Sequence, residues 1–169
     1  MISSASRLDP RELRNTFGSF GTGVTIVTTR HPQGRMVGVT ANSFSSVSLD
    51  PPIVLWSLLS TSPSLEAFDE AGRFAINVLS AGQHALCRQF SSRVPDKFAG
   101  VSWQQGLGGL PVLDDCAATI ECRTIERRTV GDHVLFLGQV ENYSYQRIPP
   151  LLFCQGNFLQ GVALELSAS

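Results

Sequence analysis

Short runs of β-branched and apolar residues, separated by turn residues, divide most of this chain into predicted strands. Residues 24–29 form one such run, and His31-Pro32-Gln33-Gly34 supplies the turn into a second run at residues 36–41. The run at residues 53–57 is apolar enough to be buried on both of its faces. The remaining predicted strands are residues 73–79, 117–127, 133–145 and 151–154.

Three shorter segments carry the signals of helices. The first begins after Asp9, a candidate N-cap that is followed by Pro10 at the first helical position. The other predicted helices are residues 63–71, with Ser62 as a candidate N-cap, and residues 80–90. At least six strands joined by short turns, with only three helices, favour a mainly β fold. We expect an antiparallel sheet closed into a barrel rather than a doubly wound parallel sheet.

The composition limits the class of protein. The chain has 169 residues, of which 43% are apolar and 16% charged, with a formal net charge of -1. This length predicts a single domain over residues 1–169, and the near-neutral charge gives no electrostatic reason to expect nucleic acid as a partner. A low charged fraction predicts that a second subunit covers part of the apolar surface.

Targeting and metal signals are missing from the sequence pattern. The first ten residues lack the apolar core of a signal peptide, and no run has the length of a transmembrane helix. Four cysteines are scattered without a CxxC pair, and three histidines have no ligand spacing with them. We therefore expect a cytoplasmic protein with reduced thiols and no metal site.

Two common enzyme motifs, the dinucleotide-binding loop and the serine-hydrolase motif, are not found in the sequence. The glycines at residues 18–23 lie between a predicted helix and a predicted strand, which is the reverse of the order in a dinucleotide-binding GxGxxG loop. The second glycine cluster, residues 106–109, is interpreted as a flexible loop. No GxSxG sequence is present, so the local signature of a serine hydrolase is missing.

Hydroxyl and amide side chains concentrate at residues 37–52, which read VGVTANSFSSVSLDPP. Hydroxyls are costly to bury without partners, so their density beside strand residues predicts a pocket for a flat, polar ligand. A second polar segment, residues 57–64, lies at a predicted helix start, where backbone N–H groups favour a phosphate. The alternative for this second segment is simple capping by Ser62.

Two further polar pieces lie later in the chain. In residues 90–98, FSSRVPDKF, Arg93 and Lys97 place two cations beside two hydroxyls, and the alternative is a solvated loop. The tight turn Gly131-Asp132-His133 delivers a histidine to the start of a predicted strand. A histidine there can titrate near neutral pH and offer a polar contact to a ligand.

Five segments carry a family resemblance: GTGVTIVTT, VGVTANSFSSVSLDPP, GRFAINVL, FSSRVPDKFAG and GDHVLFLGQV. In this order and spacing the chain resembles the flavin reductase family with the FMN-binding split-barrel fold, from about residue 9 to residue 161. The resemblance implies an antiparallel split β-barrel with flanking short helices. It also implies a homodimeric NAD(P)H:flavin oxidoreductase that reduces FMN or FAD with NADH or NADPH. The reduced flavin would pass to a separate flavin-dependent monooxygenase.

The resemblance also implies roles for individual residues. The flavin ring would contact Thr40, Ala41, Asn42 and Ser43, with Ser46, Val47 and Ser48 next to it. Ser57 would lie near the ribityl chain, and Ser62 and Ser64 would hold phosphate. The phosphate or adenylate end would meet Phe90, Ser91, Arg93 and Lys97. His133 would face the nicotinamide side of the flavin.

The chain departs from the family pattern in residues 151–158. Phe153 is kept, but Cys154, Gln155 and Phe158 replace an aromatic, a basic residue and a tyrosine. The segment, including Phe153 and Phe158, is expected to help hold the pyridine nucleotide, so the change puts the choice of nucleotide in doubt. Two alternative functions stay open: an enzyme that keeps its flavin and acts on another substrate, and a flavin carrier without turnover.

Overall fold

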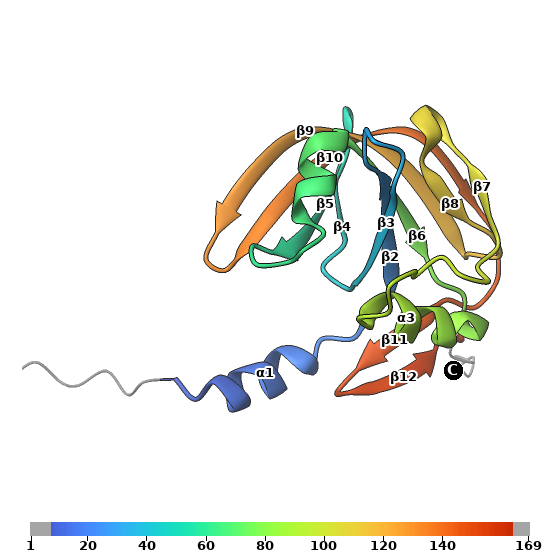
Figure 1. The fold of residues 1–169 in the computed structure, drawn as a ribbon. Coiled ribbons are helices and arrows are strands. Elements are labelled where there is room, and N and C mark those ends of the chain that lie inside the picture. Colours follow the sequence, from blue (N-terminus) through green and yellow to red (C-terminus); the bar gives the residue numbers. More distant parts are fainter. Residues whose placement is uncertain (1–7, 164–169) are drawn as a thin grey trace, which may run out of the picture.

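A curved seven-stranded antiparallel sheet forms the body of the protein. The structure, a computed structural model, describes residues 8–163. Along the sheet the strands are β3 (Met36–Ala41), β2 (Thr25–Arg30), β6 (Arg73–Val78), β9 (Ala118–Val130), β10 (His133–Tyr145), β5 (Pro52–Leu59) and β4 (Ser45–Leu49). Figure 1 shows the sheet arched into a dome, with β3 and β4 brought toward each other. This confirms the predicted mainly β, antiparallel architecture.

Two smaller sheets and the helices extend this body. One sheet has the order β1 (Thr22–Gly23), β11 (Leu151–Cys154), β12 (Asn157–Gln160), and the other pairs β7 (Trp103–Gln105) with β8 (Pro111–Leu113). The α-helices are α1 (Pro10–Gly18), α2 (Leu65–Ala71) and α3 (His84–Ser91), and the short 3₁₀ helices are η1 (Ala81–Gln83) and η2 (Leu107–Gly109). No helix in residues 8–163 is long and apolar enough to cross a membrane.

An aromatic cluster fills the concave side of the sheet. The rings of Trp56 and Phe136 stack with centroids 4.9 Å apart, and Phe68 of α2 meets Trp56 edge-on at 4.8 Å. Phe74 completes the cluster, and all four side chains are almost fully buried. Aromatic burial of this size stabilises a small domain strongly. A second core lies under α3, where Phe90 and Phe98 pack edge-to-face at 5.0 Å.

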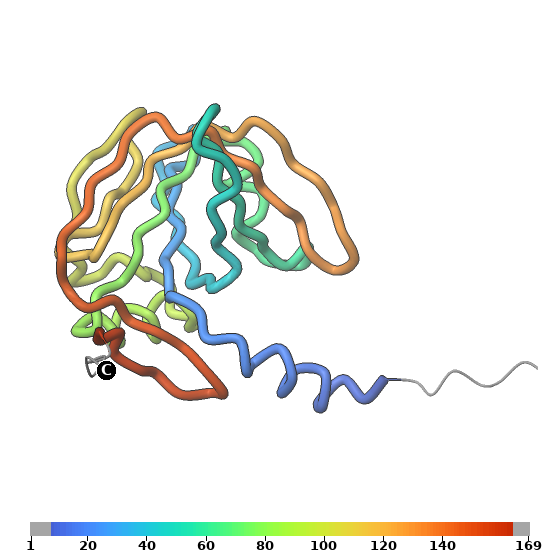
Figure 2. Tube along the Cα trace, turned by 180° about the vertical axis from the view of Figure 1, so that it is seen from behind, coloured from blue at the N-terminus to red at the C-terminus, as the bar shows by residue number. Residues whose placement is uncertain are grey.

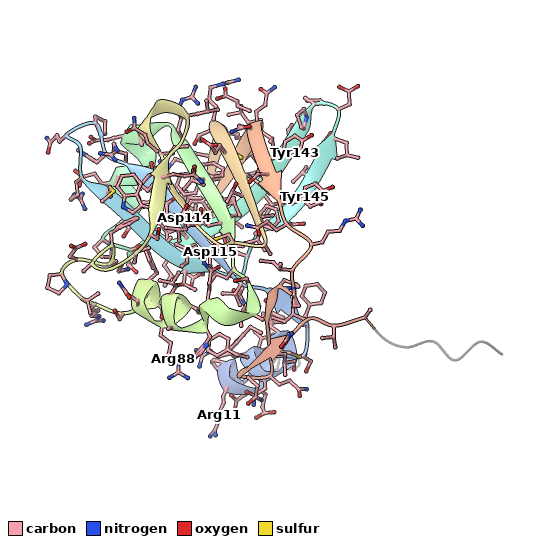
Figure 3. All side chains as sticks on the ribbon, turned by 90° about the vertical axis from the view of Figure 1, so that its right-hand side faces the viewer. Arg11, Arg88, Asp114, Asp115, Tyr143 and Tyr145 are labelled. Carbon is pink, nitrogen blue, oxygen red and sulfur yellow. The ribbon has the colours of Figure 1, made fainter. Side chains whose placement is uncertain are left out.

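The first helix stands away from this body. As predicted, Asp9 caps it by accepting the backbone N–H groups of Arg11 and Glu12, and Pro10 is its first residue. In the described structure α1 contributes no buried residue, and Phe17 is 67% exposed. Figures 1 and 2 show it projecting sideways beside the β11–β12 hairpin, and in Figure 3 Arg11 points outward from it.

The sequence located most elements but missed five short strands. Residues 36–41, 133–145 and 151–154 are strands with the predicted bounds. The missed strands are β1, β4, β7, β8 and β12. The second helix begins at Leu65, so the predicted start at residue 63 and the prediction of Ser62 as the N-cap residue were wrong; Ser64 is the N-cap, and Ser62 Oγ accepts its N–H. Residues 18–23 form the expected turn, which ends in the two-residue strand β1.

Candidate functional site

The hydroxyl-rich segment connects the end of β3 to the edge strand β4. Thr40 lies on the face of β3 that α3 covers, and its Oγ1 donates a hydrogen bond to the Cys87 carbonyl oxygen at 2.8 Å. Ser43 Oγ accepts the backbone N–H of Ser57 at 2.9 Å and donates to the Ser57 carbonyl at 3.1 Å. These two hydroxyls therefore hold the segment in place with bonds to their own chain.

Other members of the segment remain open. Asn42, Ser46 and Val47 are exposed, and Ser48 is half-buried. β4 is the last strand of the seven-stranded sheet, and its register with β5 shifts between Ser46 and Ser48. An edge strand presents backbone N–H and C=O groups that no neighbouring strand uses. The segment can therefore form main-chain hydrogen bonds with a flat polar ring. The free polar side chains of Asn42 and Ser46 add further possible contacts.

A groove of about 780 Å³ runs along the outer side of β3. One wall is β3 and the residue before it, Arg35, and the other wall is the loop of residues 92–98, with Pro63 and Ser64 at the start of α2. Three of the predicted phosphate contacts line it: Ser64, Arg93 and Lys97. Arg35 adds a cation that the sequence analysis did not select. Cations and a hydroxyl converging on one groove fit a phosphate-bearing ligand.

Lys97 also has a structural role in the wall of the groove. Its Nζ donates to the carbonyl oxygens of Phe90 at 2.7 Å and Gly38 at 3.3 Å, which ties the loop to α3 and β3. Burial lowers the pKa of this ammonium, because desolvation penalises its charged form. Phe90 is buried beneath the groove, where its ring occupies the space that a Cβ at Gly38 would need. Lys97 and Phe90 thus shape the wall.

The serines around the groove differ in availability. Ser62 Oγ accepts the backbone N–H of Ser64 at 3.3 Å, whereas the Ser64 hydroxyl makes no capping bond. Ser64 is therefore the serine of the pair whose hydroxyl can reach a ligand. Ser91 is exposed at the end of α3, and its Oγ donates to the Arg88 carbonyl at 3.0 Å. Arg88 itself projects from α3 in Figure 3.

His133 begins β10 after a tight turn in which Gly131 adopts φ +59°, a conformation that favours glycine. Its Nδ1 lies 2.7 Å from Asp132 Oδ1. In the β10–β5 register His133 pairs with Leu59, and the next pair on the same face is Leu135 with Ser57. This face is opposite to the aromatic core, so His133 and Ser57 are neighbours on the outer side of the sheet.

The divergent C-terminal segment lies in a different sheet. Phe153 and Phe158 are cross-strand partners with ring centroids 5.4 Å apart. Gln155 adopts φ +47° at the hairpin turn, and its backbone N–H donates to the Gly18 carbonyl at the end of α1 at 2.8 Å. A groove of about 630 Å³ lies here, between α1 and the hairpin turn. Phe153 lines this groove, and His133 does not.

A metal centre finds no support in the described part of the chain, where no cluster of three or more His, Cys, Asp or Glu side chains occurs. All four cysteines are free, as the sequence predicted. Sequence reasoning assigned no role to Arg35, to Ser60 or to the Asp132 carboxylate. Arg35 could have been found as the cation that ends the β2–β3 turn, whereas the Ser60 and Asp132 contacts depend on tertiary structure.

Comparison with known proteins shows the family of this chain. The flavin reductase like domain matches residues 17–161. The chain belongs to the flavin reductase family. A probable flavin reductase of Rhizobium meliloti (strain 1021) is 43% identical over 155 residues, which cover 92% of this chain and 50% of that protein. The chain therefore spans only half the length of that relative.

Two further relatives match over most of both chains. The reductase subunit HsaB of a flavin-dependent monooxygenase from Rhodococcus jostii (strain RHA1) is 41% identical, covering 92% of this chain and 80% of HsaB. The Streptomyces globisporus C-1027 NADH:FAD oxidoreductase SgcE6, solved in complex with NAD and FAD fragments, superposes with a TM-score of 0.86 at 36% identity. That match covers 94% of this chain and 98% of SgcE6. The resemblance stated from the sequence is confirmed.

Proposed function

We propose that this protein is an NAD(P)H:flavin oxidoreductase that reduces FMN or FAD and supplies the reduced flavin to a separate monooxygenase. The observation that carries the proposal is the groove along β3, where Arg35, Arg93 and Ser64 converge, in a sheet whose other end is the open edge strand β4. A phosphate-bearing ligand with a flat polar ring fits this combination of charges and main-chain groups. The names of the relatives HsaB and SgcE6 support the same activity.

The flavin is a substrate that carries the redox chemistry, accepting a hydride from the reduced nicotinamide. The contribution of the chain is placement, because holding two reactants in contact removes most of the entropic barrier. Arg93 and Arg35 would hold the phosphate, and residues 41–48 would bind the ring through the β4 edge. Main-chain N–H groups there would stabilise negative charge on the pyrimidine end of the ring. His133 would contact the nicotinamide.

A homodimer is part of this proposal. Leu13, Phe17 and Phe20 are exposed on and after α1, which stands off the body of its own chain. An isolated helix of nine residues is marginal in water, so α1 needs a surface to pack against. A second copy would supply it and would explain the low charged fraction. The double variant L13S/F17S should then halve the particle mass measured by light scattering, and a monomeric parent protein would contradict the homodimer.

A cytoplasmic location completes the proposal and is supported by the four free thiols. The enzyme activity is tested by steady-state oxidation of NADH and NADPH with added FMN, FAD or riboflavin. Saturable dependence on free flavin is the expected result. Turnover only with a tightly held flavin and another acceptor would favour the alternative enzyme, and stoichiometric flavin binding without nucleotide oxidation would favour a carrier.

A further inference from the structure

His31 is a buried histidine at the tip of the β2–β3 hairpin, and the site described above does not use it. Its backbone N–H donates to the Arg35 carbonyl at 2.9 Å, which closes the turn of residues 32–34. The ring Nδ1 accepts the backbone N–H of Gln33 at 3.1 Å, and Nε2 lies 2.9 Å from Oε2 of Glu70 on α2. Both ring nitrogens therefore have a partner, and one of these partners is a carboxylate on another element.

The turn determines which ring nitrogen of His31 carries a proton. A backbone N–H only donates, so Nδ1 must accept from Gln33 and carries no proton in this arrangement. The neutral ring then has its proton on Nε2, which donates to the Glu70 carboxylate. A proton on Nδ1 would point at the N–H of Gln33 and break that bond. His31 is thus held as a neutral hydrogen-bond donor to Glu70.

Arg35 is the cross-strand neighbour of His31. The β2–β3 register pairs Arg30 with Met36, so the next pair toward the turn is His31 with Arg35. Paired residues of an antiparallel hairpin have side chains on the same face, with Cβ atoms about 5 Å apart. Arg35 is exposed and lines the groove along β3, and within residues 8–163 its guanidinium has no recorded ion pair. The two side chains therefore start from neighbouring positions, one bonded to a carboxylate and the other free.

The other carboxylates of this region are bonded elsewhere or lie at the start of α2. Asp96 lines the groove along β3, and its Oδ1 accepts the backbone N–H of Phe98 at 2.9 Å. Asp69 of α2 pairs with Arg127 of β9. Glu66 is exposed in the first turn of α2 and has no recorded ion pair in the described part of the chain. Glu66 is therefore a suitable control for the removal of a negative charge from this helix.

Glu70 is the carboxylate that the hairpin brings beside Arg35. It is bonded to the neighbour of Arg35 and its side chain is half-exposed, so the longer arginine side chain can reach it. A guanidinium paired with a carboxylate is less available to a phosphate, because both bind the same fork of N–H donors. We propose that His31 is a positioning residue, which holds Glu70 through Nε2 and so leaves Arg35 free to bind the flavin phosphate. This proposal rests on the proposed function, because it takes Arg35 to contact that phosphate.

Two substitutions of His31 separate this role from a structural role in the turn. His31→Asn keeps an acceptor for the Gln33 N–H, since asparagine bonds the backbone N–H two residues on, but its side chain is too short for Glu70. His31→Gln keeps an N–H donor for Glu70 and loses the bond within the turn. The FMN dissociation constant should rise about three- to fivefold in His31→Asn, the value of an exposed ion pair, and stay near the parent value in His31→Gln. Riboflavin has no phosphate and should bind all three proteins equally.

Removal of the Glu70 charge is the second test. Glu70→Gln should restore FMN binding in the His31→Asn background, because an amide forms no ion pair with Arg35. Glu66→Gln is the matched control, and its effect on FMN binding should be the same with and without His31→Asn. A loss of FMN affinity in His31→Gln with none in His31→Asn would overturn the proposal, and so would a loss in His31→Asn that Glu70→Gln does not restore.

Chemical modification measures the freedom of Arg35 without a flavin. Phenylglyoxal reacts with free guanidinium groups, and mass spectrometry of the digested protein gives the rate at Arg35. This rate should fall in His31→Asn and return to the parent value when Glu70→Gln is added, whereas an equal rate in all three proteins would overturn the proposal. A parent protein that binds FMN no more tightly than riboflavin would instead overturn the phosphate role of the groove, and the Arg35 rates would still decide how His31 acts.

Discussion

The groove along β3 and the hairpin β11–β12 are built in opposite ways. In the groove, hydrogen bonds to their own chain hold Lys97 and Thr40, and burial holds Phe90. These residues form a rigid wall, and a few cations of the groove remain free. In the hairpin, Phe158 packs on Phe153 and against the second core, whereas the exposed Gln155 is bonded only to the end of α1. A ligand therefore meets a preformed surface on the flavin side, whereas the exposed turn of the C-terminal hairpin, at Gln155 and Gly156, can change its residues without disturbing the core.

The largest expected effect comes from filling the packed wall of the groove. A Cβ at Gly38 would lie 2.4 Å from Phe90 Cε1, and Phe90 is buried with no free direction in which to move. Gly38→Ala should lower the free energy of unfolding by about 2–3 kcal/mol, as overpacked core sites do. Denaturant unfolding measures this. Gly23→Ala is the control, because nothing lies within 4 Å of its added Cβ, and equal losses in the two variants would argue against a rigid wall.

Removing a free cation from the same groove should affect binding and leave the fold intact. Arg93 is exposed and lines the groove, so Arg93→Ala should weaken FMN binding by about 2 kcal/mol, the value of a hydrogen bond to a charged group. Riboflavin lacks the phosphate, so its affinity should not change. Fluorescence titration with both flavins measures the difference, and equal losses for the two would remove Arg93 from the phosphate site.

Some strands of this fold could be predicted from the sequence, and others could not. The strands at residues 36–41 and 133–145 follow from local β-branched patterns and turn residues, which act over short distances. β8 was missed because it is held by remote partners, such as Asn77 Oδ1, which accepts the Leu113 N–H at 2.8 Å. The edge strand β4 was missed as a strand and interpreted only as part of a ligand pocket, because its serines have low strand propensity.

The candidate site, like the fold, could be predicted only in part from the sequence. Residue types identified the hydroxyl-rich segment and the cations of residues 90–98 as candidates. Which hydroxyls are free depends on partners far along the chain: Thr40 is bonded to Cys87, and Ser43 to Ser57, whereas Ser46 makes no recorded side-chain bond within residues 8–163. A count of hydroxyls therefore overestimates the number of ligand contacts.

A pair of serine variants sharpens this distinction between bound and free hydroxyls. Ser43→Ala removes two hydrogen bonds to the Ser57 backbone and should lower the free energy of unfolding by about 1 kcal/mol. Ser46→Ala removes an exposed hydroxyl and should leave stability unchanged while it weakens flavin binding. Thermal unfolding and flavin titration of both variants separate the two roles. If Ser46→Ala were the less stable variant, the assignment of the two hydroxyls would be reversed.

The smallest expected effect comes from a variant in the turn of the β11–β12 hairpin. Gln155 holds φ +47° in the left-handed region, which disfavours side chains, and the next residue, Gly156, also has a positive φ. Gln155→Gly should raise the free energy of unfolding by about 0.5 kcal/mol, because relief of backbone strain exceeds the added entropy of the unfolded chain. A gain in stability with unchanged KM for NADH would show that the hairpin turn is dispensable for the nucleotide. A gain in stability with a raised KM would mean that the glutamine is kept in a strained conformation for its contact with the nucleotide, as strained residues at functional sites often are. Gly156→Ala, which introduces strain at the next position, should instead lower stability and so verifies the sign of the effect.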